Sequence, residues 1–235
     1  MQIERIKINN IPSIIWGGKS NKVFIAIHGN MSSKEDEVIK ILADKVINKG
    51  YQLLSFDLPE HGERKLDTNY LCKVQNCIND LGLIIDYAKT NFSEINIWAC
   101  SIGAYFSLLA YKDENIKQCL FLSPVVNMEI IIDNMMKWSN TTESKLKEKQ
   151  EIRTDFGQTL YWDYYLYVKE NPITQWNKKT YILYGDKDNM QDKKVIQKFS
   201  DNFNCELTIL KSGEHYFHTE KQLNCYKNWL DRIIR

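Results

Sequence analysis

A serine, an aspartate and a histidine follow one another in this chain in an order that nucleophilic catalysis uses. Ser101 lies between the apolar run "INIWAC" and the segment "IGAYFSLLAY", where an expected strand turns into an expected helix. The small residues Ala99 and Gly103 stand two positions before it and two after it. A tight turn brings strand and helix close together, admits only small neighbours and holds the serine hydroxyl above the sheet edge. The spacing predicts a nucleophile, although a serine that only caps a helix would fit it too.

The general base has few candidates, because the chain contains four histidines. His215 follows the last expected strand, in "KSGEHYFHTEKQ", and should lie at the same sheet edge as Ser101. Imidazole is the side chain best suited to proton transfer near neutral pH, so we predict His215 as the base. His218 adjoins the expected cap of the last helix and is the alternative. His28 and His61 lie in earlier turns, where we expect His28 to form structural hydrogen bonds.

An acid that orients the histidine is expected in "TYILYGDKDNM". A buried strand ends there at Gly185, and Asp186 and Asp188 follow it. A carboxylate at the carboxyl end of a strand can accept a hydrogen bond from an imidazole and fix its tautomer. Aspartate is also common in turns for purely structural reasons. The residues alone leave both aspartates open.

Backbone N–H groups near Ser101 are expected to bind a developing negative charge. The N–H of Ile102 belongs to the first turn of the helix that follows the serine, where the helix dipole favours an anion. Another buried strand, "VFIAI", ends in His28 and Gly29. The chain that leaves it can offer the N–H of Asn30 or, one residue later, that of Met31. We predict an oxyanion site from Ile102 and Asn30, with Met31 as the alternative.

The elements that must position these groups alternate along the chain. We expect strands at residues 3–8, 13–16, 23–28, 52–57, 95–99, 118–123, 180–184 and 206–210. We expect helices from Ser32 or Ser33 to Gly50, over 70–92, after Ser101, over 193–202 and from Thr219 onward. Continuous apolar runs are typical of strands that are buried on both faces. The pattern predicts an α/β fold: a mostly parallel sheet of about eight strands, an antiparallel edge hairpin and helices on both faces.

Residues 125–176 interrupt this alternation, because they contain no convincing strand. They are rich in methionine and aromatic residues, and a structureless loop of this length would be unusual. We expect a helical cap, inserted into a core made of residues 1–124 and 177–235. Its apolar residues indicate a substrate pocket, to which we assign Met31, Trp138 and Trp162. Aromatic residues at helical spacing also pack a helix onto its neighbours, so a purely structural role is the alternative.

The composition restricts the class of protein. The formal net charge is +1, which gives no reason to expect binding to nucleic acid or to an anionic membrane. No apolar run approaches the length needed to span a bilayer, and "MQIERIKINN" does not resemble a signal peptide. The six cysteines are scattered and do not cluster with histidine, so we expect free thiols in the cytoplasm and no metal site. Cys100, beside Ser101, is expected to be a core thiol.

Taken together, three motifs resemble those of the α/β-hydrolase family. "ACSIG" resembles the family's nucleophile elbow, with Ala99 in place of the first glycine. "HGN" resembles the end of the strand that contributes to the oxyanion site. "DLPEHGER" resembles the family's D-x-P-G-H-G-x-S stretch, from which Glu60 and Arg64 depart. The resemblance covers nearly the whole chain.

The order of the candidate residues also matches that family. Ser101, Asp188 and His215 follow the family order of nucleophile, acid and base. In relatives the acid lies three residues past the glycine that ends its strand. Counting from Gly185, the resemblance favours Asp188 over Asp186.

The resemblance implies a serine hydrolase, in particular a carboxylesterase. Such an enzyme would cleave carboxylic esters or thioesters of small to medium acyl or aryl groups through an acyl-enzyme, without a cofactor. Its partner would be a small-molecule ester. A peptidase, amidase or acyltransferase could use the same three residues. A catalytically silent protein that uses the cap as a binding surface is the alternative from another class.

Overall fold

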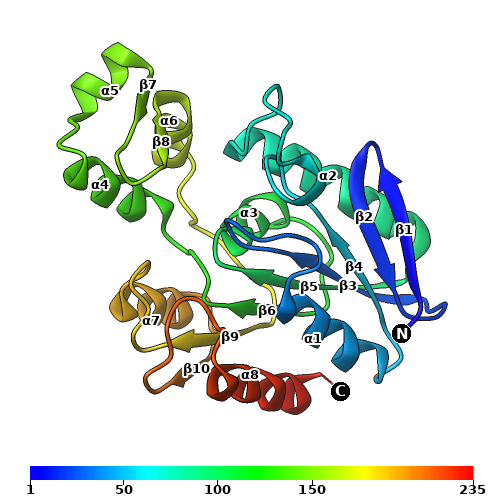
Figure 1. The fold of residues 1–235 in the computed structure, drawn as a ribbon. Coiled ribbons are helices and arrows are strands. Elements are labelled where there is room, and N and C mark those ends of the chain that lie inside the picture. The colour runs from blue at the N-terminus through cyan, green and yellow to red at the C-terminus, as the bar shows by residue number, and fades with distance from the viewer. Residues whose placement is uncertain (235) are drawn as a thin grey trace.

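One eight-stranded sheet forms the centre of the computed structural model, which describes residues 1–234 (Figure 1). In spatial order its strands are β1 (Ile3–Ile8), β2 (Ile11–Trp16), β4 (Gln52–Phe56), β3 (Lys22–Ile27), β5 (Glu94–Cys100), β6 (Cys119–Leu122), β9 (Thr180–Gly185) and β10 (Glu206–Leu210). β2 pairs antiparallel with β1 and with β4, and every other neighbouring pair is parallel. The predicted mostly parallel sheet of about eight strands, with an antiparallel edge hairpin, is confirmed.

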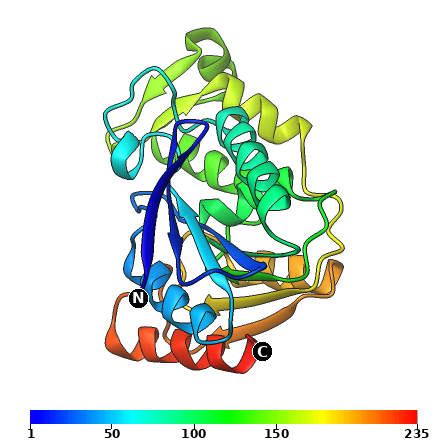
Figure 2. The ribbon, with the colours of Figure 1, turned by 90° about the vertical axis from the view of Figure 1, so that its right-hand side faces the viewer.

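Helices cover both faces of the sheet. On one face lie α1 (Glu37–Ile47) and α8 (Glu220–Ile233), which contact each other, and on the other lie α2 (Val74–Asn91), α3 (Ile102–Ala110) and α7 (Lys193–Asn202) (Figures 1 and 2). Each strand packs against both helix layers because its successive side chains point to opposite faces of the sheet. In β3, Ile25 packs with the α2 and α3 side, whereas Phe24 and Ala26 pack with α1 and α8. None of the helices in residues 1–234 is both long and apolar enough to cross a bilayer.

Two helices begin later than expected, and the first of them has a side-chain cap that the pattern passed over. α1 begins after Asp36, whose carboxylate accepts a hydrogen bond from the Glu37 N–H at 2.6 Å, rather than at Ser32 or Ser33. α2 begins at Val74 instead of residue 70. The expected cap of α8 is present, with Thr219 and Gln222 in a reciprocal capping box.

Residues 125–176, which we call the insert, connect β6 to β9. They form α4 (Met128–Trp138), α5 (Glu143–Lys149), α6 (Trp162–Glu170) and a hairpin of β7 (Glu151–Arg153) with β8 (Thr159–Tyr161). The expectation that this region contains no strand was wrong. Gly157 turns the hairpin at φ +82°, and Ile152 pairs with Leu160 across it. Figures 1 and 2 show these elements grouped together to one side of the sheet.

Gly103 lets α3 pack directly on the end of β3. A Cβ atom at this position would lie 2.5 Å from the carbonyl oxygen of His28 and 2.6 Å from that of Ile27. Any side chain would therefore overlap with backbone atoms that cannot move independently of the sheet. The contact explains why the residue two positions after Ser101 is a glycine.

Substituting this glycine should destabilise the fold. We expect Gly103→Ala to lower the free energy of unfolding by about 1–3 kcal/mol, because the added methyl group overlaps with the backbone of β3. Gly82, inside α2, has open space around its Cα, so Gly82→Ala should raise it by about 0.5–1 kcal/mol. Urea unfolding of both variants measures the two shifts. Equal effects of the two substitutions would contradict the packing argument.

Candidate active site

Ser101 stands in a strained turn between β5 and α3. Its φ is +51° and its ψ is −121°, a conformation that residues with a side chain rarely adopt and that costs about 1–3 kcal/mol. Backbone hydrogen bonds hold the turn: the Ser101 N–H donates to the Leu122 carbonyl at 3.1 Å, and the Val125 N–H donates to the Ser101 carbonyl at 3.0 Å. The end of β6 therefore braces the serine in the position that the sequence predicts.

The structure brings Ser101, His215 and Asp188 together in one hydrogen-bonded line. The Ser101 Oγ lies 2.9 Å from Nε2 of His215, and Nδ1 of the same ring lies 2.7 Å from Oδ2 of Asp188. An ionised carboxylate only accepts hydrogen bonds, so the imidazole proton belongs on Nδ1. Nε2 is then free to accept the serine proton. This arrangement is suited to activating a hydroxyl as a nucleophile.

Asp188 is held more firmly than Asp186. Its side chain is fully buried, and its second oxygen, Oδ1, accepts hydrogen bonds from the N–H groups of Met190 at 2.8 Å and Gln191 at 3.2 Å. Asp186 instead accepts a hydrogen bond from the Ser212 N–H at 2.5 Å. The structure thus places Asp188 at the imidazole and gives Asp186 a role in fixing the loop before His215.

Two glycines bring the loop that contains His215 to the strand that ends before Asp188. A Cβ atom on Gly185 would lie 2.3 Å from the carbonyl oxygen of Gly213. His218, the alternative base, lies outside the hydrogen-bonded line. Its ring stacks on Tyr216 at 5.0 Å between ring centres.

The His61 ring holds the turn that follows β3. Its Nδ1–H donates to the Pro59 carbonyl at 2.7 Å, so Nε2 of the neutral ring accepts the Met31 N–H at 3.1 Å. Among residues 1–234, the backbone N–H groups of Asn30 and Ile102 have no acceptor. Of the two donors that the sequence left open, the Met31 N–H is therefore already hydrogen-bonded, and an anion-binding role for Asn30 stays a prediction.

His28 links this turn to the next one along the sheet edge. Its ring is buried, donates from Nδ1 to the Gly29 carbonyl at 2.7 Å and accepts the Leu58 N–H at Nε2 at 3.0 Å. Burial lowers the pKa of His28 to about 4, because a charged ring would lose its hydration. The ring is therefore neutral at physiological pH and serves as a structural connector.

The residues that depart from the expected "DLPEHGER" pattern have structural partners. The Arg64 guanidinium donates to the Asp80 carboxylate at 2.5 Å and to the Asp57 carbonyl at 3.1 Å. Glu60 accepts a hydrogen bond from the Cys72 N–H at 2.6 Å. Both departures therefore stabilise the loop beside the candidate site.

Comparison with solved structures identifies the architecture. Est1E from Butyrivibrio proteoclasticus, solved with ferulic acid bound, superposes with a TM-score of 0.78 at 19% identity, over 97% of this chain and 96% of its own. The chain has the α/β-hydrolase fold. Mouse alpha/beta hydrolase domain-containing protein 10 gives a TM-score of 0.76 at 14% identity, over 100% of this chain and 98% of its own.

A third structure extends the comparison. A protein from Xanthomonas campestris, described as an α/β serine hydrolase without lid, gives a TM-score of 0.66 at 14% identity, over 98% of this chain and 93% of its own. No protein-family model matches the sequence, and no curated protein matches it either. At these identities the likeness establishes the fold, and the chemistry must be argued from the site.

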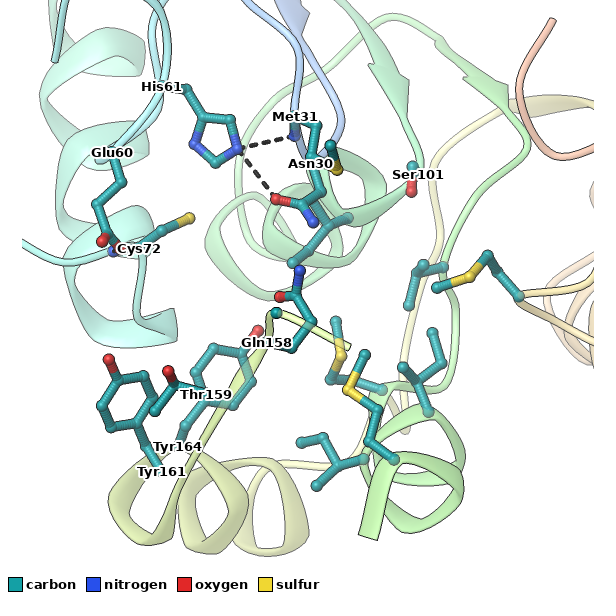
Figure 3. Close-up of a pocket in the computed structure, with 18 of the residues that line it drawn as sticks. Asn30, Met31, Glu60, His61, Cys72, Ser101, Gln158, Thr159, Tyr161 and Tyr164 are labelled. Carbon is teal, nitrogen blue, oxygen red and sulfur yellow. Dashed lines mark hydrogen bonds between the residues drawn. The ribbon is translucent and has the colours of Figure 1, made fainter. Parts of the chain in front are cut away.

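Two cavities meet at Ser101 in this α/β-hydrolase fold. The first has a volume of about 530 Å³ and lies between the serine and the insert (Figure 3). Its apolar wall is made by Ile102, Val125, Met128, Ile131, Ile132, Met135, Leu160 and Met190. Its polar wall is made by Glu60, His61, Gln158, Thr159, Tyr161 and Tyr164. The second cavity, of about 700 Å³, extends from Ser101 past His215 toward Trp98 and Phe217.

Only one of the three predicted substrate-contacting residues lines these cavities. Met31 lines both and is 89% exposed. Trp138 is 67% exposed and meets Phe156 edge-on, and Trp162 packs on Tyr165, so neither tryptophan lines either cavity. Both tryptophans instead pack on other residues of the insert.

Much of the apolar wall of the first cavity, which the prediction missed, comes from one face of α4. Met128, Ile131, Ile132 and Met135 recur at the spacing of one helix face on α4, a signal that was legible in the sequence. Tyr164 was also missed. Its hydroxyl is buried at the polar wall and has no hydrogen-bond partner among residues 1–234.

Cys100, which was expected to be a core thiol, is partly buried and lines the second cavity. Burial raises its pKa to about 12, so the thiol remains protonated and unreactive at neutral pH. Within residues 1–234, no three His, Cys, Asp or Glu side chains gather in a way that could hold a metal ion.

The buried His28 should make the fold sensitive to acid. Its pKa is lower in the folded chain than in the unfolded chain, so its contribution to stability is full above pH 6.5 and is lost as the pH falls toward 4. We expect the wild type to lose about 2 kcal/mol of unfolding free energy from this group between pH 7 and pH 5.

Urea unfolding of the wild type and of His28→Gln at both pH values isolates this term. The variant cannot titrate at position 28, so its stability should fall less over the same interval. Parallel losses in the two proteins would show that His28 does not carry the effect.

Proposed function

We propose that this chain is a serine carboxylesterase that cleaves carboxylic esters or thioesters of small to medium acyl or aryl groups. The proposal rests on the hydrogen-bonded line from Ser101 through His215 to Asp188, with distances of 2.9 Å and 2.7 Å. That line lies at the sheet edge where the α/β-hydrolase fold places its nucleophile elbow. The serine opens onto a cavity with an apolar wall.

The arrangement supports acylation in two proton transfers. His215 Nε2 takes the proton of Ser101 as Oγ attacks the ester carbonyl carbon, and the N–H groups of Asn30 and Ile102 stabilise the resulting oxyanion. When the intermediate collapses, the imidazolium gives its proton to the leaving alcohol or thiol. The buried Asp188 carboxylate stabilises the imidazolium in between.

Deacylation repeats the same steps with water as the nucleophile. His215 removes a proton from the water as it attacks the acyl-enzyme, and returns it to Ser101 when the acid leaves. The residues of the site supply the base, the acid and the anion-binding donors. The mechanism requires no cofactor.

The substrate class follows from the two walls of the first cavity. Its volume of about 530 Å³ and the α4 stripe suit a small or medium apolar group, and Tyr164 can hydrogen-bond to a polar substituent at the far end. An aryl acid belongs to this class, and the Est1E structure contains ferulic acid. We propose that the insert, residues 125–176, acts as a cap on a core of 1–124 and 177–235, because it supplies this wall.

A cytoplasmic location is part of the proposal. All six cysteines are free thiols in the structure, and two of them lie close enough to react with each other. Free thiols persist where cellular reductants keep them reduced.

Ser101→Ala should abolish esterase activity. Hydrolysis of p-nitrophenyl esters from acetate to palmitate should fall by about 10⁴- to 10⁶-fold, because the attacking oxygen is lost. Ser107→Ala is a matched control, since that hydroxyl on α3 donates to the Gly103 carbonyl and should leave the rate within a few-fold. The chain-length profile of the wild type would measure the size of the pocket. Equal activity in wild type and Ser101→Ala would favour a catalytically silent binding protein.

The two aspartates should differ sharply in effect. Asp188→Asn should lower kcat by about 10⁴-fold, because an amide at this position favours the wrong tautomer of His215. Asp186→Asn should change kcat by less than about tenfold, since the Asp186 carboxylate accepts the Ser212 N–H and lies outside the hydrogen-bonded line. Steady-state kinetics on the best p-nitrophenyl ester measures both variants. Comparable losses would remove Asp188 from its proposed role.

A further inference from the structure

Two thiols are in contact beside the first cavity. Cys72 lies in the loop before α2, and its Sγ is 3.6 Å from the Sγ of Cys77 in the first turns of that helix. Cys72 lines the cavity together with His61 (Figure 3), and Cys77 is fully buried behind it in the core. The proposed esterase mechanism uses neither thiol.

The two sulfurs are in different chemical states. Burial raises the pKa of Cys77 well above its ordinary value, so this thiol keeps its proton and can donate it in a hydrogen bond. That hydrogen bond is the largest influence that lowers the pKa of Cys72, to about 6, although burial opposes it. A lowered pKa favours the thiolate of Cys72, the form that attacks electrophiles.

The other four cysteines lack this combination. Burial raises the pKa of Cys100, Cys119, Cys205 and Cys225, and none of them has a second sulfur in contact within residues 1–234. A reactive thiolate that lines a cavity and touches a buried partner thiol is the arrangement of a peroxide-sensing pair.

We propose that Cys72 is a peroxide-reactive thiol and Cys77 its resolving partner, so that oxidation closes a disulfide at the wall of the first cavity. In the first step the Cys72 thiolate attacks a peroxide oxygen, the O–O bond breaks, and Cys72 becomes a sulfenic acid while hydroxide leaves and is protonated to water. In the second step the Cys77 sulfur attacks the Cys72 sulfur, the S–O bond breaks, and a second water carries away the thiol proton. Two electrons pass from the thiols to the peroxide.

The geometry allows this bond to form by movement of Cys72. A disulfide requires the sulfurs to approach from 3.6 Å to about 2.0 Å. Cys77 is fixed by the helix and the core, whereas Cys72 lies in the stretch without helix or strand between Arg64 and Val74. The shift would alter the cavity wall next to His61.

Peptide mapping tests the pair directly. The reduced full-length protein is treated with a small excess of hydrogen peroxide, alkylated and digested with trypsin, which cleaves after Lys73 and so separates the two cysteines. We expect the peptides LDTNYLCK and VQNCINDLGLIIDYAK to be joined by a disulfide that dithiothreitol reverses. Oxidation spread evenly over the six cysteines would overturn the proposal.

Variants assign the roles of the two sulfurs. In Cys77→Ser the sulfenic acid should persist on Cys72, where dimedone labels it at least about tenfold faster than Cys225. In Cys72→Ser, Cys77 should stay reduced, and the matched control Cys225→Ser should still form the disulfide. Labelling of Cys72 in Cys77→Ser no faster than that of Cys225 would overturn the assignment. These readouts are masses, so they are independent of the proposed esterase activity.

Discussion

Crowding at the turn between β5 and α3 is the constraint on which the rest of this structure depends. α3 packs so closely on the end of β3 that only glycine fits at position 103, and the chain must pass through a positive φ at Ser101 to make the turn. The strain at Ser101 is maintained because backbone bonds to Leu122 and Val125 hold it on the other side. As a result, the Ser101 hydroxyl lies at the edge of the sheet, 2.9 Å from the His215 ring.

Parallel strands then bring the partners of Ser101 to it from distant parts of the sequence. β3, β5 and β9 all end at the same edge, so the turns that follow them meet although they are up to about 160 residues apart. Close contact between Gly185 and Gly213 adds the His215 loop to this edge. His28 and His61 connect the neighbouring turns through their rings. The site is thus a property of the sheet edge as a whole.

The insert and the loop before α2 supply most of the wall of the first cavity. α4 contributes an apolar stripe, β8 and α6 contribute polar groups, and Cys72 and Glu60 enter from the loop. The Lys73 ammonium pairs with Asp163 of α6 at 2.6 Å, which ties the loop to the insert. The loop and the insert therefore meet at the wall of the cavity that Ser101 faces.

The sequence by itself determined the α/β alternation and the candidates Ser101, Asp188 and His215, because strand ends, small residues and chain order are local features. Only the tertiary structure showed that Asp188 contacts the His215 ring and that the Met31 N–H is engaged by His61, since these hydrogen-bond partners come from remote segments. It also revealed the β7–β8 hairpin, whose three-residue strands are too short for a periodic signal. The cavity walls, the exclusion of Trp138 from them and the contact of the two thiols depend on packing between elements, which no single segment encodes.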